Sequence, residues 1–352
     1  KAAQDYFLLI GPPGTGKTSC ALKKMVETFH ADKDAQILLL SYTNRAVDEI
    51  CKSLASIAPA VDFIRVGSEL SCDEAYRGHL IENELSSCNR RSEVYERIRN
   101  CRIIVGTVAA ISGKPELFRL KHFDVAIIDE ATQILEPQLL GILCARGEDG
   151  KDAIDKFVLI GDHKQLPAVV QQNTEQSAIY DESLLSIGLT NLKDSLFERL
   201  YRNCTATVHR SYDMLCRQGR MHPEVALFAN RAFYGGRLIP VGLPHQIESS
   251  DTICRLAFYP SVPEKVGASA KINYSEARIV ADLAVRIYED HQADFDESRT
   301  LGIITPYRSQ IALIKKEIES LGIPALNRIL VDTVERFQGS ERDVIIYSFC
   351  VN

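Results

Sequence analysis

Short apolar runs recur along the chain and alternate with stretches of helical periodicity. The runs are rich in Leu, Ile and Val, and they comprise residues 7–10, 37–40, 103–105, 125–128, 157–160, 303–305 and 344–347. Nearly continuous apolar strands that alternate with helices are typical of parallel sheets covered on both faces. The pattern therefore predicts an α/β fold.

The rhythm of strands and helices also predicts how the 352 residues divide into domains. A polar, weakly periodic stretch interrupts it between about residues 170 and 215, and a chain of this length is typical of two domains. We place the first domain at residues 1–205 and the second at 206–352. The segment from about residue 55 to 101 is longer than an ordinary connection and rich in Arg and Glu, which predicts helices inserted into the first domain with their charges in solvent.

Charge and composition narrow the class of protein. The net charge is −6, from 41 basic and 47 acidic residues, which argues against a uniformly basic surface but leaves room for a local nucleic-acid groove. No apolar run approaches the roughly 18 residues of a membrane span, and the first residues do not resemble a secretory signal. We therefore expect a cytoplasmic or nuclear protein that does not contact a membrane.

Ten cysteines are scattered along the chain without any Cys-x-x-Cys pair. We expect reduced and mostly buried thiols rather than disulfides. The spacing of Cys72, His79, Cys88 and Cys101 matches no zinc or iron–sulfur pattern, so no metal is assigned to them.

A phosphate-binding motif follows the first apolar run directly and precedes a helical pattern. It consists of Gly11, Pro12, Pro13, Gly14, Thr15, Gly16, Lys17 and Thr18, and it fits G-x-x-x-x-G-K-[ST]. The glycines allow backbone N–H groups to face phosphate oxygens, and the following helix adds its positive end. Lys17 is expected to reach the β- and γ-phosphates of ATP, and the Thr18 hydroxyl to bind Mg²⁺.

The second half of a hydrolytic site is present as well. The apolar run 125–128 ends in Asp129 and Glu130, so both carboxylates are expected at the carboxyl end of a buried strand. Asp129 would hold Mg²⁺, and Glu130 would orient and deprotonate the attacking water. A third strand is followed by Gln165, whose amide could contact both the γ-phosphate and that water, although a simple polar loop would look the same.

With these residues assembled, the chain resembles the superfamily 1 helicases, in the branch of the nonsense-mediated-decay RNA helicase and the eukaryotic nuclease-helicase. Beyond the P-loop, the resemblance is carried by ordered blocks at 41–48, 103–107, 129–133, 161–167, 217–223, 305–310, 331–334 and 337–343. It spans nearly the whole chain. It implies two RecA-like domains, with ATP between them and a single strand of DNA or RNA crossing them.

The resemblance also implies roles for individual residues. Arg220 would reach the γ-phosphate as an arginine finger supplied by the same chain, and Glu341 would bond the ribose. A single-strand path that contacts backbone and bases without reading sequence would be lined by Thr43, Asn44, Thr107, Pro306, Thr333 and Val334. His222 is expected to be structural rather than a nucleotide contact.

Two departures from the family pattern qualify these expectations. Gly219 stands where the family usually has the Tyr that stacks on adenine, so nucleotides other than ATP are expected to be accepted. No block resembles the final motif of the family, so we expect the second domain to be incomplete at its C-terminus and the chain to be a fragment.

The predicted function is therefore ATP-dependent translocation or unwinding of single-stranded nucleic acid, 5′ to 3′ by resemblance. One alternative is a nucleic-acid-stimulated ATPase that remodels nucleoprotein complexes without processive unwinding. The other is a nucleotide-gated interaction module. The sequence does not distinguish DNA from RNA, because contacts to the 2′-hydroxyl leave no readable signature, and it names no protein partner.

Overall fold

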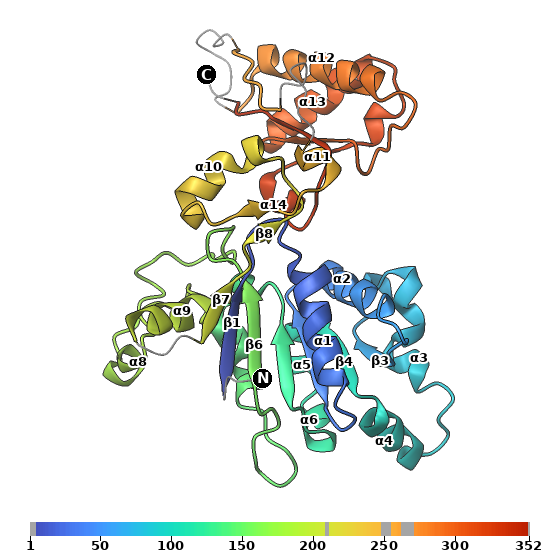
Figure 1. The fold of residues 1–352 in the computed structure, drawn as a ribbon, viewed down its shortest axis with the longest axis vertical. Coiled ribbons are helices and arrows are strands. Elements are labelled where there is room, and N and C mark those ends of the chain that lie inside the picture. Colours follow the sequence, from blue (N-terminus) through green and yellow to red (C-terminus); the bar gives the residue numbers. More distant parts are fainter. Residues whose placement is uncertain (1–4, 208–210, 248–254, 262–270, 351–352) are drawn as a thin grey trace. The chain divides into compact units, whose positions relative to one another are not determined.

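The structure is a computed structural model that describes residues 5–207, 211–247, 255–261 and 271–350 (Figure 1). The chain forms two compact units, Lys1–Arg255 and Leu256–Asn352. Each unit contains a sheet in which all described pairs of neighbouring strands are parallel. The predicted α/β class is therefore confirmed.

The first unit is built on a seven-stranded sheet of order β3-β4-β2-β5-β6-β1-β7 within the described residues. Its strands are β1 (Tyr6–Ile10), β2 (Ile37–Ser41), β3 (Phe63–Val66), β4 (Ile103–Thr107), β5 (Val125–Ile128), β6 (Phe157–Gly161) and β7 (Tyr212–Met214). Because the strands are parallel, their carboxyl ends share one edge, and the loops after β1, β5 and β6 meet there.

Helices cover both faces of this sheet, as its apolar strands require. On β1, Leu9 packs into the core of one face, while Leu8 and Ile10 pack into the core of the other. The first face is covered by the π-helical turn η1 (Lys17–Leu22), α1 (Lys23–His30) and α2 (Asn44–Ala55). The second face is covered by α4 (Arg91–Asn100), α5 (Val108–Ser112), α6 (Glu116–Leu120), α7 (Glu136–Leu143) and α9 (Leu196–Ala206). Full burial of one Leu or Ile contributes about 1.5–3 kcal/mol, so the two cores fix the sheet and the loops at its edge.

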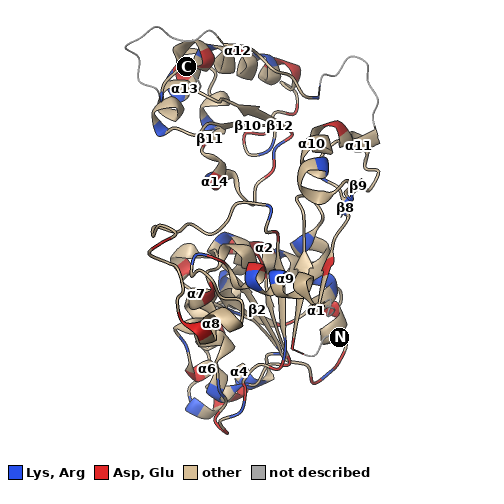
Figure 2. Ribbon diagram, turned by 90° about the vertical axis from the view of Figure 1, so that its left-hand side faces the viewer, with Lys and Arg blue, Asp and Glu red and all other residues tan. Residues whose placement is uncertain are grey.

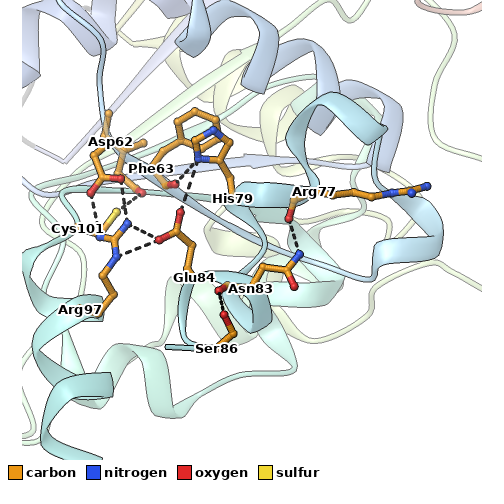
Figure 3. Close-up of polar contacts among 10 residues, drawn as sticks. Asp62, Phe63, Arg77, His79, Asn83, Glu84, Ser86, Arg97 and Cys101 are labelled. Atoms are coloured by element: carbon orange, nitrogen blue, oxygen red, sulfur yellow. Dashed lines mark hydrogen bonds and ion pairs between the residues drawn. The ribbon is translucent and has the colours of Figure 1, made fainter. Parts of the chain in front are cut away.

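The segment expected to be a helical insertion begins instead with a strand, β3, at the sheet edge. Its helical parts are η2 (Glu69–Ser71), η3 (Glu74–His79), α3 (Ile81–Glu84) and α4. Arg97 holds them together: its guanidinium donates to Asp62 at 2.9 Å and to Glu84 at 2.7 Å (Figure 3). The ring of His79 stacks on Phe63 with 4.0 Å between centroids, which ties η3 to β3.

Residues that follow the first predicted domain belong to the first compact unit. Strand β7 pairs in parallel with β1, and it is followed by β8 (Arg217–Gln218), α10 (Pro223–Tyr234), β9 (Ile239–Pro240) and α11 (Pro244–Ile247). A further short helix, α8 (Glu182–Ser186), precedes α9. The compact units thus divide at 255/256 rather than at 205/206, and the functional domain boundary stays a prediction.

The second unit contains a three-stranded sheet of order β11-β10-β12 within the described residues. Its strands are β10 (Leu301–Ile304), β11 (Leu330–Asp332) and β12 (Val344–Tyr347). Its helices are α12 (Tyr274–Asp290), α13 (Arg308–Ser320), η5 (Leu326–Arg328) and α14 (Val334–Phe337). The small residues Ala277, Ala281 and Ala284 of α12 pack in one core with Ile314 and Ile318 of α13.

Basic and acidic residues are interspersed over the ribbon rather than collected in a single large region (Figure 2). This distribution agrees with the near balance of 41 basic and 47 acidic residues. Within the part of the chain that is described, no helix is long and apolar enough to cross a membrane.

Candidate nucleotide site

The P-loop turns tightly between β1 and η1. The Gly11 N–H donates to the carbonyl of Gly161 at 2.9 Å, which joins the start of the loop to the end of β6. Gly14 and Gly16 have φ angles of 72° and 73°, a left-handed conformation that glycine adopts without the strain a side chain adds. Backbone in such turns can direct its N–H groups toward an anion, and phosphate binding by this loop stays a prediction.

Lys17 folds back over this loop. A Cβ placed on Gly11 would lie 2.0 Å from Lys17 Cγ, so only glycine leaves room for the lysine stem. The Lys17 Nζ lies 3.3 Å from Glu130 Oε1, and 12% of the Lys17 side chain and 24% of the Glu130 side chain are exposed. The structure thus brings the predicted phosphate ligand together with the predicted catalytic base.

Thr18 and Asp129 form the second contact between the P-loop and the strand β5. The Thr18 hydroxyl donates to Asp129 Oδ2 at 2.5 Å, and the Asp129 side chain is buried. Burial, followed by the neighbouring Glu130 charge, raises the pKa of Asp129 to about 6, although Thr18 and Lys17 act in the opposite direction. The two oxygens are of the hard type that Mg²⁺ takes, so the residues predicted to bind the metal fit it.

Glu130 has an unusual backbone. Its φ angle is 52°, a left-handed conformation that is uncommon outside glycine. The Gln133 Nε2 donates to Glu130 Oε2 at 3.2 Å, so the carboxylate is held by Gln133 and by Lys17. Strained backbone of this kind is found at functional sites, where the surroundings hold it in place.

Gln165 lies in the loop after β6 and is tied to Asp162. The Gln165 Nε2 donates to Asp162 Oδ2 at 2.7 Å, and Asp162 is almost fully buried. The same Asp162 oxygen accepts from the Tyr234 hydroxyl at 2.7 Å. Gln165 thus follows β6, the strand between β5 and β1, and its role as a phosphate sensor stays a prediction.

The predicted arginine finger lies in the same compact unit as the P-loop. The Gly219 N–H donates to the Gly14 carbonyl at 2.8 Å, and a Cβ on Gly14 would lie 2.4 Å from Arg220 Cβ. The Arg220 N–H donates to the buried Gln218 side chain at 3.0 Å. His222 caps α10, because its Nδ1 accepts from the Glu224 N–H at 3.3 Å, and this contact is structural.

The predicted nucleic-acid residues of the first unit gather at the carboxyl ends of two paired strands. Ser41 of β2 is in register with Thr107 of β4, and Thr43 and Asn44 follow β2 at once. The Thr107 hydroxyl accepts from Ala110 N at 3.1 Å and caps α5. The Thr43 hydroxyl caps α2 in the same way, with Ala46 N as donor at 3.2 Å.

The remaining predicted residues lie in the second unit. Pro306 follows β10, Thr333 and Val334 follow β11, and these two strands pair in parallel. The three residues therefore share one sheet edge. Glu341 lies in the loop between α14 and β12, and its role at the ribose stays a prediction.

Sequence reasoning did not single out Asp162 or Tyr234 as site residues. Asp162 lies in the block 161–167, which also contains Gln165, so its closeness to Gln165 in the sequence could have indicated it. Tyr234 is 72 positions away from Asp162 and carries no local signal.

Comparisons with known proteins agree with this geometry. A family model described as an AAA domain matches residues 2–94 and 82–173, and a second AAA-domain model matches residues 192–352. The P-loop, the paired carboxylates and the parallel sheets define a P-loop nucleotide-binding protein. More narrowly, the chain belongs to the superfamily 1 helicases, in the branch predicted from its motifs.

Its relatives include three helicases. The DNA replication ATP-dependent helicase/nuclease DNA2 of Gallus gallus is 30% identical over 99% of this chain and 32% of its own length. The helicase/nuclease JHS1 of Arabidopsis thaliana is 30% identical over 99% of this chain and 24% of its own length. The DNA polymerase alpha-associated DNA helicase A of Saccharomyces cerevisiae is 24% identical over 98% of this chain and 57% of its own length. The chain thus spans about a third or less of the first two relatives.

Proposed function

We propose that this chain is the ATP-hydrolysing motor of a helicase or translocase that moves along single-stranded nucleic acid. The observation that carries the proposal is the pair of contacts between the P-loop and the end of β5. Lys17 pairs with Glu130 at 3.3 Å, and Thr18 bonds Asp129 at 2.5 Å. A phosphate ligand, a metal ligand and a base thus meet at one sheet edge, which is the arrangement that phosphoryl transfer to water requires.

The residues suggest an order of events. Lys17 leaves Glu130 when the γ-phosphate of ATP arrives, because a phosphate carries more negative charge than one carboxylate. The freed Glu130 accepts a proton from water, the water oxygen attacks the γ-phosphorus, and the bond to the β-phosphate oxygen breaks to release ADP. Gln165 orients that water, and Arg220 stabilises the charge that develops on the phosphate.

Mg²⁺ is the metal that the donor set favours. Thr18 and Asp129 would hold it, and it would neutralise charge on the β- and γ-phosphate oxygens of bound ATP. Because Asp129 is buried and is already bonded to Thr18, both oxygens are positioned before any metal binds.

The nucleic-acid track is proposed from the strand ends. Thr43, Asn44 and Thr107 share one edge in the first unit, and Pro306 and Thr333 share one in the second unit. Relatives named as DNA helicases support DNA as the strand, and movement from 5′ to 3′ is proposed from the family resemblance. A strand-displacement assay on duplexes with a 5′ or a 3′ overhang tests the direction, since only the 5′ overhang should support unwinding.

The variant Glu130→Gln tests the hydrolytic site most selectively. The side chain keeps its size but cannot accept the proton, so ATP binding should persist while turnover falls about 10²–10⁴-fold. Fluorescent ATP-analogue binding and single-turnover hydrolysis measure the two quantities separately. Turnover at the wild-type rate would refute Glu130 as the base.

A further inference from the structure

We propose that Tyr234 is a positioning residue for ATP hydrolysis. It acts through Asp162 on Gln165, so that hydrolysis depends on how helix α10 packs. The proposal rests on the proposed function, because it assumes that Gln165 contacts the γ-phosphate or the attacking water. Tyr234 and Gln165 meet on one oxygen, Asp162 Oδ2, at 2.7 Å each.

Asp162 is the centre of this arrangement. Its side chain is 1% exposed, and its second oxygen, Oδ1, accepts from the Lys164 N–H at 3.0 Å. A buried carboxyl group is costly unless its oxygens have donors, and here three donors supply them. Removing one donor leaves part of that cost uncompensated, so the position of Asp162 depends on Tyr234.

The contact with Asp162 also fixes which way the Gln165 amide faces. Because Nε2 donates to Asp162, the amide oxygen Oε1 is left for another partner. An acceptor in that place suits the proton of an attacking water. If Asp162 shifts, the amide loses the contact that sets this orientation, and Gln165 can rotate.

Tyr234 brings a distant helix into the site. It is the last residue of α10, only 8% of it is exposed, and it lies 72 positions from Asp162. Burial, followed by the hydrogen bond to Asp162, raises the pKa of Tyr234 above its ordinary value, so the phenol keeps the proton that it donates.

Helix α10 therefore touches the nucleotide site at both of its ends. Arg220 lies just before it, at the P-loop residue Gly14, while Tyr234 at its other end bonds Asp162. A twelve-residue helix is rigid over this length, so a displacement of Arg220 from the P-loop is transmitted to Asp162. The position of the loop that carries Gln165 therefore depends on whether Arg220 lies against the P-loop.

The test compares Tyr234→Phe with Tyr201→Phe in the full-length protein. Tyr234→Phe removes only the hydroxyl, and kcat for ATP should fall about three- to tenfold while KM for ATP changes less than about twofold. Tyr201 packs on His163, next to Asp162, with 4.4 Å between ring centroids, and its hydroxyl forms no hydrogen bond in the described part of the chain. Tyr201→Phe should therefore keep the wild-type kcat.

A double-mutant cycle with Gln165→Ala separates positioning from stability. If Tyr234 acts through Gln165, the Tyr234→Phe change should cause no further loss of kcat once Gln165 is alanine. The same fold loss in both backgrounds, or an unchanged kcat for Tyr234→Phe, overturns the proposal. Asp162→Asn provides a second variant, because its amide has one acceptor oxygen for three donors that two carboxylate oxygens serve in the wild type, and a comparable loss of kcat is expected.

The outcomes also distinguish this proposal from the proposed function. Wild-type kcat for Gln165→Ala alone would overturn the proposal and the assumed role of Gln165, while leaving the hydrolytic site of Lys17 and Glu130 intact. Hydrolysis that survives Lys17→Ala and Glu130→Gln would overturn the proposed function itself.

Discussion

The ammonium of Lys17 lies 3.3 Å from the carboxylate of Glu130, so the proposed phosphate ligand and the proposed base neutralise each other. This pairing predicts two effects of Lys17→Ala: ATP loses its main cationic ligand, and Glu130 loses its counter-charge. Hydrolysis should fall at least about 10²-fold, as is typical when one preorganised charge is removed from an active site. Steady-state phosphate release measures it.

Lys24→Ala is the matched control for this variant. Lys24 lies on α1 and pairs with Glu27 at 3.0 Å, with 79% of its side chain exposed. An exposed pair of this kind contributes little, so this variant should keep the wild-type rate. Equal losses in the two lysine variants would contradict the assignment of Lys17.

Asp129, the proposed ligand of Mg²⁺, should lower the free energy of unfolding at neutral pH. Its pKa in the folded protein is raised to about 6 from an ordinary value of 3.8, so ionisation penalises the folded state. The penalty is absent below about pH 4, grows between about pH 4 and pH 6, and is fully present above that range. Asp129→Asn should therefore raise the free energy of unfolding at pH 7 by about 2–3 kcal/mol, while ATP hydrolysis is lost.

Urea unfolding at pH 7 and at pH 4 measures this effect. The stability gain of Asp129→Asn should shrink toward zero at pH 4, where the wild-type carboxyl is protonated in the folded protein. A variant less stable than wild type at pH 7 would show that the buried carboxylate is compensated by its neighbours.

Gly14 is predicted to be required for ATP binding and hydrolysis, because any larger residue at this position would collide with Arg220. A Cβ on Gly14 would lie 2.4 Å from Arg220 Cβ, and its φ of 72° adds backbone strain. Gly150 has a φ of 77° and open space around its Cβ position, so Gly150→Ala carries the strain without the clash. Gly14→Ala should reduce ATP binding and hydrolysis about tenfold or more, and Gly150→Ala should leave both unchanged. Equal ATP hydrolysis by the Gly14→Ala and Gly150→Ala variants would show that Arg220 does not lie against Gly14.

The ion pair of Glu136 on α7 and Arg199 on α9 should be the polar contact between these helices that contributes most to the free energy of unfolding. Two guanidinium nitrogens donate to the carboxylate at 2.5 and 2.7 Å, and both side chains are about nine-tenths buried. Glu136→Ala leaves Arg199 buried without its partner, and it should cost about 3–5 kcal/mol in denaturant unfolding. Asp152→Ala, which breaks an exposed pair with Arg146, should cost less than about 1 kcal/mol.

Local patterns account for what the sequence predicted correctly. The P-loop and the end of β5 are contiguous motifs that follow continuous apolar runs, so their elements and their meeting at one sheet edge were predictable. Strand β3 was missed because Arg65 interrupts its apolar pattern. Arg65 is 1% exposed and is neutralised by Asp48 of α2, a contact that no local pattern indicates.

Long-range contacts account for the rest. The bond from Tyr234 to Asp162 joins residues 72 positions apart, so it depends on how α10 packs. Strand β7 is only three residues long and contains Asp213, and its place beside β1 could not be read from hydrophobicity.

Steady-state ATP hydrolysis, with and without single-stranded DNA or RNA, tests the central claim most directly. The full-length protein and its Glu130→Gln variant would be measured side by side. We expect hydrolysis that one polymer stimulates at least about tenfold and that the variant lacks under every condition. Hydrolysis indifferent to both polymers, or retained by the variant, would contradict a nucleic-acid-coupled motor built on Lys17 and Glu130.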